Sequence, residues 1–343
     1  MRIGLAFLLG TATFCLGADA PVADTPAVAE KSGMPDMAAT LSQQVGAVFQ
    51  RRSPAVVRVE ATDRHGKLSG TGFFADPLGT VYTVPATIGD GRNVFVVKGG
   101  RKLPAKVLAA DTRSGVALLR VENPGGAFIP VGDSRLLRLA SPVMAIGFPM
   151  DLASSPTFGI VGGFDRKFQG HFLVATHIRA NMPVQNGFGG APLLNLHGEV
   201  VGMVVAGLEG GAACFALPIE AAEKVRRDVM RFGEARPGWV GVTVESQPEG
   251  VVQVAGLGAE TPAARAGLHE GDIVRQVGNV PIKTVEDILD ASFYLTDGDF
   301  VPIRIVRDGQ EIEYSVRATT HPSNARDGLH ASSESFEFKL LTK

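Results

Sequence analysis

Short apolar runs separated by turn-forming residues fill most of the chain. Turns such as Asp76-Pro77-Leu78-Gly79 and Gly89-Asp90-Gly91 stand between them. Short strands with this punctuation are typical of β-barrels or β-sandwiches. The runs predicted as strands are Ala55–Val59, Thr71–Phe74, Val81–Thr83, Asn93–Val97, Val116–Val121, Pro142–Ile146, Phe172–Ala175 and Val200–Val205.

Two segments show a helical pattern instead. Met37, Leu41 and Val45 recur at helical spacing, which predicts a helix from Asp36 to Arg51 that ends before Pro54. A second helix is predicted over 218–232. We therefore expect a first domain over residues 36–233, followed by a hinge at 233–237.

The remaining third predicts a smaller domain over residues 238–318. Thr284 is the expected N-cap of a helix to Phe293, with Asp287 three residues on, and Asp308-Gly309 marks a hairpin. Predicted strands are Gly241–Val244, Val251–Val254, Asp272–Val277 and Val301–Val306. The polar stretch 319–343 is predicted to be a C-terminal tail.

The N-terminus has the features of a secretory signal. Arg2 precedes an apolar run from Leu5 to Leu16, and Ala18-Asp19-Ala20 matches a small-residue cleavage site. The run is too short to span a bilayer. We predict a signal peptide over 1–20 cleaved near Ala20, a linker over 21–35, and a secreted or periplasmic location. Cys214 is then the only mature thiol, and we expect it to be buried.

Composition narrows the function classes. The chain is 45% hydrophobic and 20% charged, as in a globular protein, and its net charge of −2 gives no reason to expect nucleic-acid binding. The seven histidines are not paired at metal-ligand spacing, so no metal and no cofactor is predicted.

Several stretches, in this order and spacing, resemble the HtrA (Deg) family of trypsin-like PDZ serine proteases over roughly residues 37–318. They are Gly70-Thr71-Gly72-Phe73-Phe74, Val131-Gly132-Asp133-Ser134, Ala145-Ile146-Gly147-Phe148-Pro149, Gly189-Gly190-Ala191-Pro192 and Phe215-Ala216-Leu217-Pro218. The resemblance implies a mainly β protein with a trypsin-like double β-barrel followed by a PDZ domain.

The same resemblance places other residues at the three catalytic positions. Ala86 stands where the family has its histidine base, Gly115 where it has the orienting aspartate, and Gly189 where it has the nucleophilic serine. No histidine occurs between His65 and His171, and residues 177–203 contain no Ser, Thr or Cys. Proton transfer and nucleophilic attack both need the missing side chains, so the resemblance implies a domain without catalytic residues. The N–H groups of Gly187 and Gly189 are left as an oxyanion-hole-like pair, and Phe188 is expected to fill the former cleft.

Two other interpretations of the first domain stay open. A rebuilt endopeptidase site could recruit one of four histidines, His65, His171, His177 or His197. The chain could also be a regulatory partner of an active HtrA-like protease. The family often forms trimers through its N-terminal segment, so the first helix is a candidate homotrimer contact.

The second domain keeps the residues that the resemblance requires for peptide binding. Gly238-Trp239-Val240-Gly241-Val242 matches the family's carboxylate-binding loop and its strand. Val240, Gly241 and Val242 are predicted to receive a peptide or protein C-terminus as an added strand, with Ile288 lining the opposite wall. The alternative is that Trp239 and Val242 belong to the core and the protein's own chain fills the groove.

Overall fold

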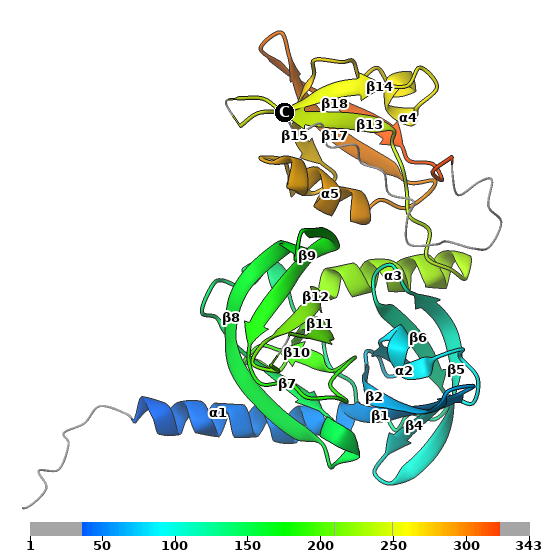
Figure 1. Ribbon diagram of the computed structural model, residues 1–343, viewed down its shortest axis with the longest axis vertical. Coiled ribbons are helices and arrows are strands. Elements are labelled where there is room, and N and C mark those ends of the chain that lie inside the picture. The colour runs from blue at the N-terminus through cyan, green and yellow to red at the C-terminus, as the bar shows by residue number, and fades with distance from the viewer. Residues whose placement is uncertain (1–35, 209, 249, 323–343) are drawn as a thin grey trace, which may run out of the picture.

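The computed structural model describes residues 36–208, 210–248 and 250–322. Its strands form two closed six-stranded barrels and one separate sheet. The sheet lies beyond the second barrel, and helix α3 (Ile219–Phe232) runs between the sheet and the barrels (Figure 1). The mainly β architecture predicted from the sequence is thereby confirmed.

The first barrel closes in the order β1-β2-β3-β6-β5-β4. Its interior is apolar, with Val57, Val59 and Ala61 alternating inward along β1, as the period of two requires. Its strands are β1 (Val56–Asp63), β2 (Gly66–Phe74), β3 (Thr80–Thr83), β4 (Phe95–Lys98), β5 (Arg101–Asp111) and β6 (Val116–Val121).

The second barrel closes in the order β10-β11-β12-β9-β8-β7. The hairpin of β8 and β9 is far longer than the Phe172–Ala175 run predicted for this region, because polar residues interrupt its hydrophobic pattern. The strands are β7 (Pro142–Gly147), β8 (Ser155–Phe168), β9 (His171–Asn181), β10 (Pro192–Leu194), β11 (Val200–Gly207) and β12 (Cys214–Pro218).

Three helices accompany the barrels. The first, α1 (Met37–Arg52), is capped by the Asp36 side chain and projects beside β8. The short α2 (Pro85–Ile88) follows β3 directly. The third, α3 (Ile219–Phe232), buries one face against both barrels and ends at Gly233 in the left-handed conformation. Single 3₁₀ turns lie at Ser53–Ala55, Ser134–Leu136 and Pro149–Asp151.

The C-terminal sheet runs in the order β13-β14-β15-β17-β18, with β16 paired to β15. Asp308 and Gly309, both at positive φ, form the predicted turn between β17 and β18. The elements are β13 (Val242–Ser246), β14 (Val252–Leu257), α4 (Pro262–Ala266), β15 (Ile273–Val277), β16 (Val280–Pro281), α5 (Val285–Phe293), β17 (Phe300–Arg307) and β18 (Gln310–Arg317).

The expected hinge is fastened on both sides. Arg236 donates its backbone N–H to the Asp228 carboxylate of α3 (3.0 Å) and accepts from the N–H of Asp297 (3.2 Å). Gly238 donates to the carbonyl of Leu295 (2.9 Å). The sheet is therefore docked on the barrels rather than tethered by a free linker.

The predicted signal peptide, linker and most of the C-terminal tail lie outside the described residues. Within the described ranges, no helix has the length and apolar character needed to cross a bilayer. Cys214 is fully buried as expected, and burial raises the pKa of its thiol to about 12.

Candidate functional site

The turn that carries Gly187 and Gly189 is strapped to β2 by one residue. Thr71 donates its backbone N–H to the Gly189 carbonyl (3.0 Å) and its hydroxyl to the Gly187 carbonyl (2.6 Å). The same hydroxyl accepts from the N–H of Phe148 (3.0 Å). Thr71 thus fixes the turn of the second barrel against the first, a role that its place within the Gly70-Thr71-Gly72 run could have suggested.

Two glycines of this turn leave no space for a side chain. A Cβ on Gly187 would lie 2.1 Å from the Phe148 carbonyl oxygen, and one on Gly190 would lie 2.1 Å from that of Thr71. Both have positive φ. Gly189 differs, because its nearest neighbour would be a Val84 methyl at 3.1 Å. The sharp turn therefore depends on Gly187 and Gly190, while Gly189 occupies the least crowded position.

The backbone donors of the turn are unevenly used. Phe188 donates to the Gln185 carbonyl (3.2 Å) and Gly190 to that of Val204 (2.8 Å). No group in the described part of the chain accepts from the N–H of Gly187 or Gly189. These two donors are the ones predicted to act as an oxyanion-hole-like pair.

The other two positions lie on neighbouring segments. Ala86 is exposed on α2, two residues after Val84, whose methyl group would lie 3.1 Å from a Cβ on Gly189. Gly115 precedes β6, which pairs with β3 through Thr83 and Ala117. A Cβ on Gly115 would lie 3.6 Å from a Val205 methyl of β11, so this position, like the Gly189 turn, lies where the barrels meet.

Gly115 has a left-handed backbone conformation, which most residues with a side chain adopt rarely. Its φ is +74°, and its N–H closes a turn onto the Asp111 carbonyl (3.0 Å). The nearby Asp111 carboxylate accepts the Ser114 hydroxyl (2.7 Å) within the same turn. This carboxylate is therefore engaged locally.

Phe188 packs inside the second barrel. Its ring is 4% exposed and packs in the core of the second barrel, where a Cβ on Gly147 would lie 2.7 Å from it. The reason is that Gly147 leaves a space in β7 that an aromatic ring can occupy.

The four histidines considered for a rebuilt site are dispersed. His65 lies in the β1–β2 turn, His171 begins β9, and His197 lies in the β10–β11 turn. His177 is 6% exposed, its Nδ1 lies 2.7 Å from the Ala175 carbonyl, and burial lowers its pKa. Among described residues, none of these four rings is hydrogen-bonded to a hydroxyl or thiol.

The second candidate site is the free edge of β13, which contacts α5 on its open side. Gly241 precedes it with φ +76°, where a Cβ would lie 2.5 Å from Thr261 and 2.8 Å from Trp239. The Val240 carbonyl accepts the N–H of Ala263 (3.0 Å). Val242 and Ile288 are half-buried and pack against the core of the sheet.

The described part of the chain leaves this edge unpaired. Trp239 is half-buried and exchanges two backbone hydrogen bonds with Thr319 (2.7 and 2.9 Å). That pairing lies before Val240, so it covers the loop and not β13. Within the described residues, no strand pairs with the outer edge of β13.

The barrel domain and the C-terminal domain each match a known protein family. Residues 70–203 match the model of the trypsin-like peptidase domain, and residues 238–317 match that of the PDZ domain. A probable periplasmic serine endoprotease DegP-like from Ectopseudomonas mendocina is 30% identical over 317 residues, which cover 88% of this chain and 66% of that one. The chain is an HtrA-family protein.

The chain spans 60–66% of the length of these curated DegP-like relatives. The DegP-like protein of Bartonella henselae is 30% identical over 83% of this chain and 60% of its own length. The serine endoprotease from Yersinia pestis is a structural neighbour with a TM-score of 0.59 and 27% identity, over 80% of this chain and 97% of that one. The HtrA-type protease AlgW with tripeptide shares the fold, with a TM-score of 0.66, 22% identity and coverage of 81% and 97%.

Proposed function

We propose that this HtrA-family chain is a non-catalytic protein of the periplasm that binds peptides or protein C-termini through its PDZ domain. The absence of any Ser, Thr or Cys from residues 177–203, which include the Gly187–Gly190 turn, carries the proposal. Two hydroxyls beside this turn, those of Thr71 and Thr83, donate to backbone carbonyls. With Ala86 as the base-equivalent residue, the turn has neither a nucleophile nor a proton acceptor.

The periplasmic location rests on the N-terminal segment and on relatives described as periplasmic. The trypsin-like barrels then act as a scaffold. The free N–H groups of Gly187 and Gly189 still suit a carbonyl or carboxylate oxygen, but binding there ends without bond cleavage.

The test for catalysis is turnover of unfolded casein by the purified chain. We expect no cleavage above that of a mock preparation. Cleavage that persists in Gly189→Ala and disappears in one of His65→Ala, His171→Ala, His177→Ala or His197→Ala would establish a rebuilt site and overturn the proposal.

The test for peptide binding uses two glycines with the same φ. Gly241 and Gly309 both have φ +76°, but an added Cβ collides with Thr261 and Trp239 only at Gly241. Against C-terminal peptides selected on the unmodified chain, Gly241→Ala should abolish binding and Gly309→Ala should leave it unchanged. Equal loss in both variants would show that backbone strain alone, and not the loop, controls binding.

An assembly role for α1 has support of its own. Residues 36–44 are exposed on the projecting half of the helix, with Met37 at 76% and Leu41 at 36%. We propose that a partner subunit covers them, either a second copy or an active HtrA-like protease. Light scattering of the chain alone and mixed with such a protease, with Met37→Ser/Leu41→Ser as the test variant, distinguishes the two.

A further inference from the structure

The PDZ domain sits on the second barrel through the same helix that forms one wall of its binding edge. Helix α5 lies directly above the β8–β9 hairpin (Figure 1). Acidic side chains of α5 meet basic side chains of the hairpin. Arg166 lies 2.6 Å from the Asp287 carboxylate, and Lys167 lies 3.1 Å from that of Glu286.

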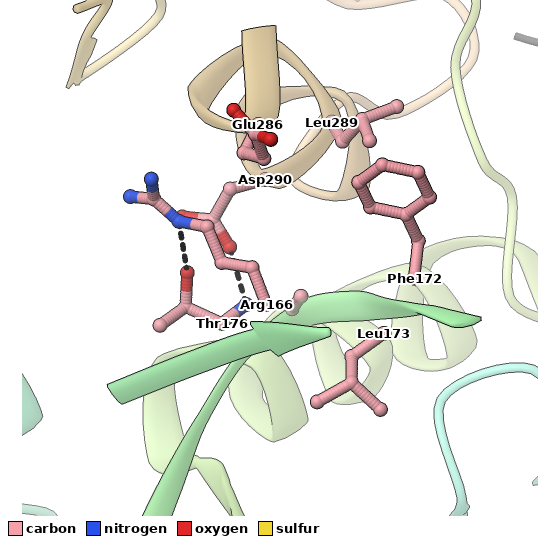
Figure 2. Close-up of a pocket in the computed structure, with 8 residues that line it drawn as sticks. Arg166, Phe172, Leu173, Thr176, Glu286, Leu289 and Asp290 are labelled. Carbon is pink, nitrogen blue, oxygen red and sulfur yellow. Dashed lines mark hydrogen bonds between the residues drawn. The ribbon is translucent and has the colours of Figure 1, made fainter. Parts of the chain in front are cut away.

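A backbone contact reinforces these pairs. Figure 2 shows Asp290 reaching down to Thr176, whose backbone N–H donates to its carboxylate (2.7 Å). Arg166 donates from Nε to the Thr176 hydroxyl (3.1 Å), which joins the two strands beneath α5. Phe172 and Leu289 face each other on the apolar side of the same contact.

Asp287 couples this contact to the position of the helix itself. One carboxylate oxygen accepts from the N–H groups of Lys283 and Thr284 (2.8 Å each), which caps α5 at its start. The other oxygen receives Arg166. Because one side chain serves both partners, the first turn of α5 cannot move without breaking the contact with the hairpin.

The far end of α5 is held as well. Phe293 is 1% exposed and belongs to the core cluster of the barrels and α3, where the Arg113 guanidinium lies 5.0 Å from its ring centre. Just beyond, Thr296 donates its hydroxyl to the buried Asp228 carboxylate (2.8 Å). Ile288, which lies between the two ends, packs against the PDZ core instead.

We infer that the barrels hold α5 in place so that the β13 edge is pre-organised for its ligand, and that peptide affinity depends on this clasp between hairpin and helix. The inference rests on the proposed peptide-binding function. Because both ends of α5 are held by the barrels, Ile288 is presented in one position, and a bound peptide does not have to order the helix. By reciprocity, a bound peptide stabilises the docked arrangement by the same factor.

The test compares three forms of the full chain. The probe is a fluorescein-labelled decapeptide with an apolar last residue, selected on the unmodified chain. Arg166→Ala/Lys167→Ala removes the clasp cations. Arg304→Ala removes a PDZ cation that, among the described residues, pairs with Glu311 and Glu313 of β18. We expect the double variant to raise Kd about fivefold or more and to speed hydrogen exchange in α5, with Arg304→Ala unchanged in both.

A charge exchange guards against indirect effects. Lys167→Glu alone should weaken binding, and adding Glu286→Lys should restore it. Unchanged or tighter binding in Arg166→Ala/Lys167→Ala would overturn the inference even if α5 exchanges faster, and so would a charge exchange that fails to restore binding. If the unmodified chain selects no peptide at all, the proposed function fails and the inference with it, whereas the exchange rates still report whether the clasp exists.

Discussion

The contact between the two barrels and the contact between the barrels and the PDZ domain are formed by different chemical groups. Where barrel meets barrel, backbone packs against backbone, with Gly190 pressed onto the Thr71 carbonyl and the Thr71 N–H donating to the Gly189 carbonyl. Where the second barrel and α3 meet the PDZ domain, charged side chains predominate, among them the buried pair of Lys224 and Asp228 at 2.8 Å.

The difference implies that the contact between the barrels is rigid, whereas the contact with the PDZ domain can be altered. A glycine contact has no side chain to reorient, so it tolerates almost no change in geometry. Charged contacts respond to salt, pH and substitution. The protein thus has a rigid turn where its barrels meet, near the residues predicted to replace the catalytic side chains (Ala86, Gly115 and Gly189). It has adjustable contacts beside the proposed ligand edge.

The largest effect is expected at the buried pair. Asp228 accepts from Lys224, Thr296 and the Arg236 backbone, and burial lowers the pKa of Lys224. Asp228→Ala leaves this ammonium buried without its carboxylate, so we expect a loss of about 3–5 kcal/mol in the free energy of unfolding by urea. Asp299→Ala, which removes an exposed pair with Arg231 at the same interface, should cost about 1 kcal/mol or less. Similar losses in both would contradict the assignment of Asp228 as the main anchor.

The next effect tests the barrel contact. Gly190→Ala adds a methyl group 2.1 Å from the Thr71 carbonyl oxygen at φ +85°, and we expect a loss of about 3 kcal/mol. Its neighbour supplies the control, since Gly189→Ala meets only a Val84 methyl at 3.1 Å and should cost about 1 kcal/mol or less. Urea denaturation measures both, and a tolerant Gly190 would show that the interface is less rigid than described.

A smaller effect is expected from pH. Burial lowers the pKa of His177 in the folded chain, so the unfolded chain binds the proton more readily. Stability should therefore fall as the pH drops through the ordinary histidine range, by up to about 1 kcal/mol per pH unit. His177→Gln should flatten the dependence between pH 7.5 and 5.5, whereas His197→Gln in an exposed turn should retain it. An equally steep dependence in both variants would assign it to other groups.

The smallest expected effect is a different response of the two interfaces to added salt. Raising NaCl from 50 to 500 mM screens partly exposed pairs such as Lys167 with Glu286. Hydrogen exchange in α5 should quicken about twofold to fivefold, with no change at Thr71, whose N–H is held by the Gly189 carbonyl. Equal acceleration at both places would remove the contrast.

Much of the fold could be predicted because its signals are local. The predicted strand runs, the Thr284 cap of α5 and the Asp308-Gly309 turn depend on neighbouring residues, and the structure has each of them. The extent of β8 and β9 was missed, since strands stabilised by cross-strand pairing need no continuous apolar pattern.

The candidate sites likewise contain residues that spacing along the chain could place and contacts that it could not predict. Ala86, Gly115 and Gly189 could be placed by spacing, and they remain predictions as catalytic equivalents. The burial of Phe188 beside Gly147 and the grip of Arg166 on Asp287 join residues far apart in the chain, so only the folded structure reveals them.

Barrel closure has a consequence for unwanted association. Closed barrels present no strand edge, so in the described sheets the open edges are those of β13, β18 and the two-residue β16. Glu311 and Glu313 stand along β18 and pair with Arg304, which guards that edge by charge. The outer edge of β13 follows Val242 and Val244 with fewer charges, so self-assembly into extended sheets would start there whenever a guest strand is missing.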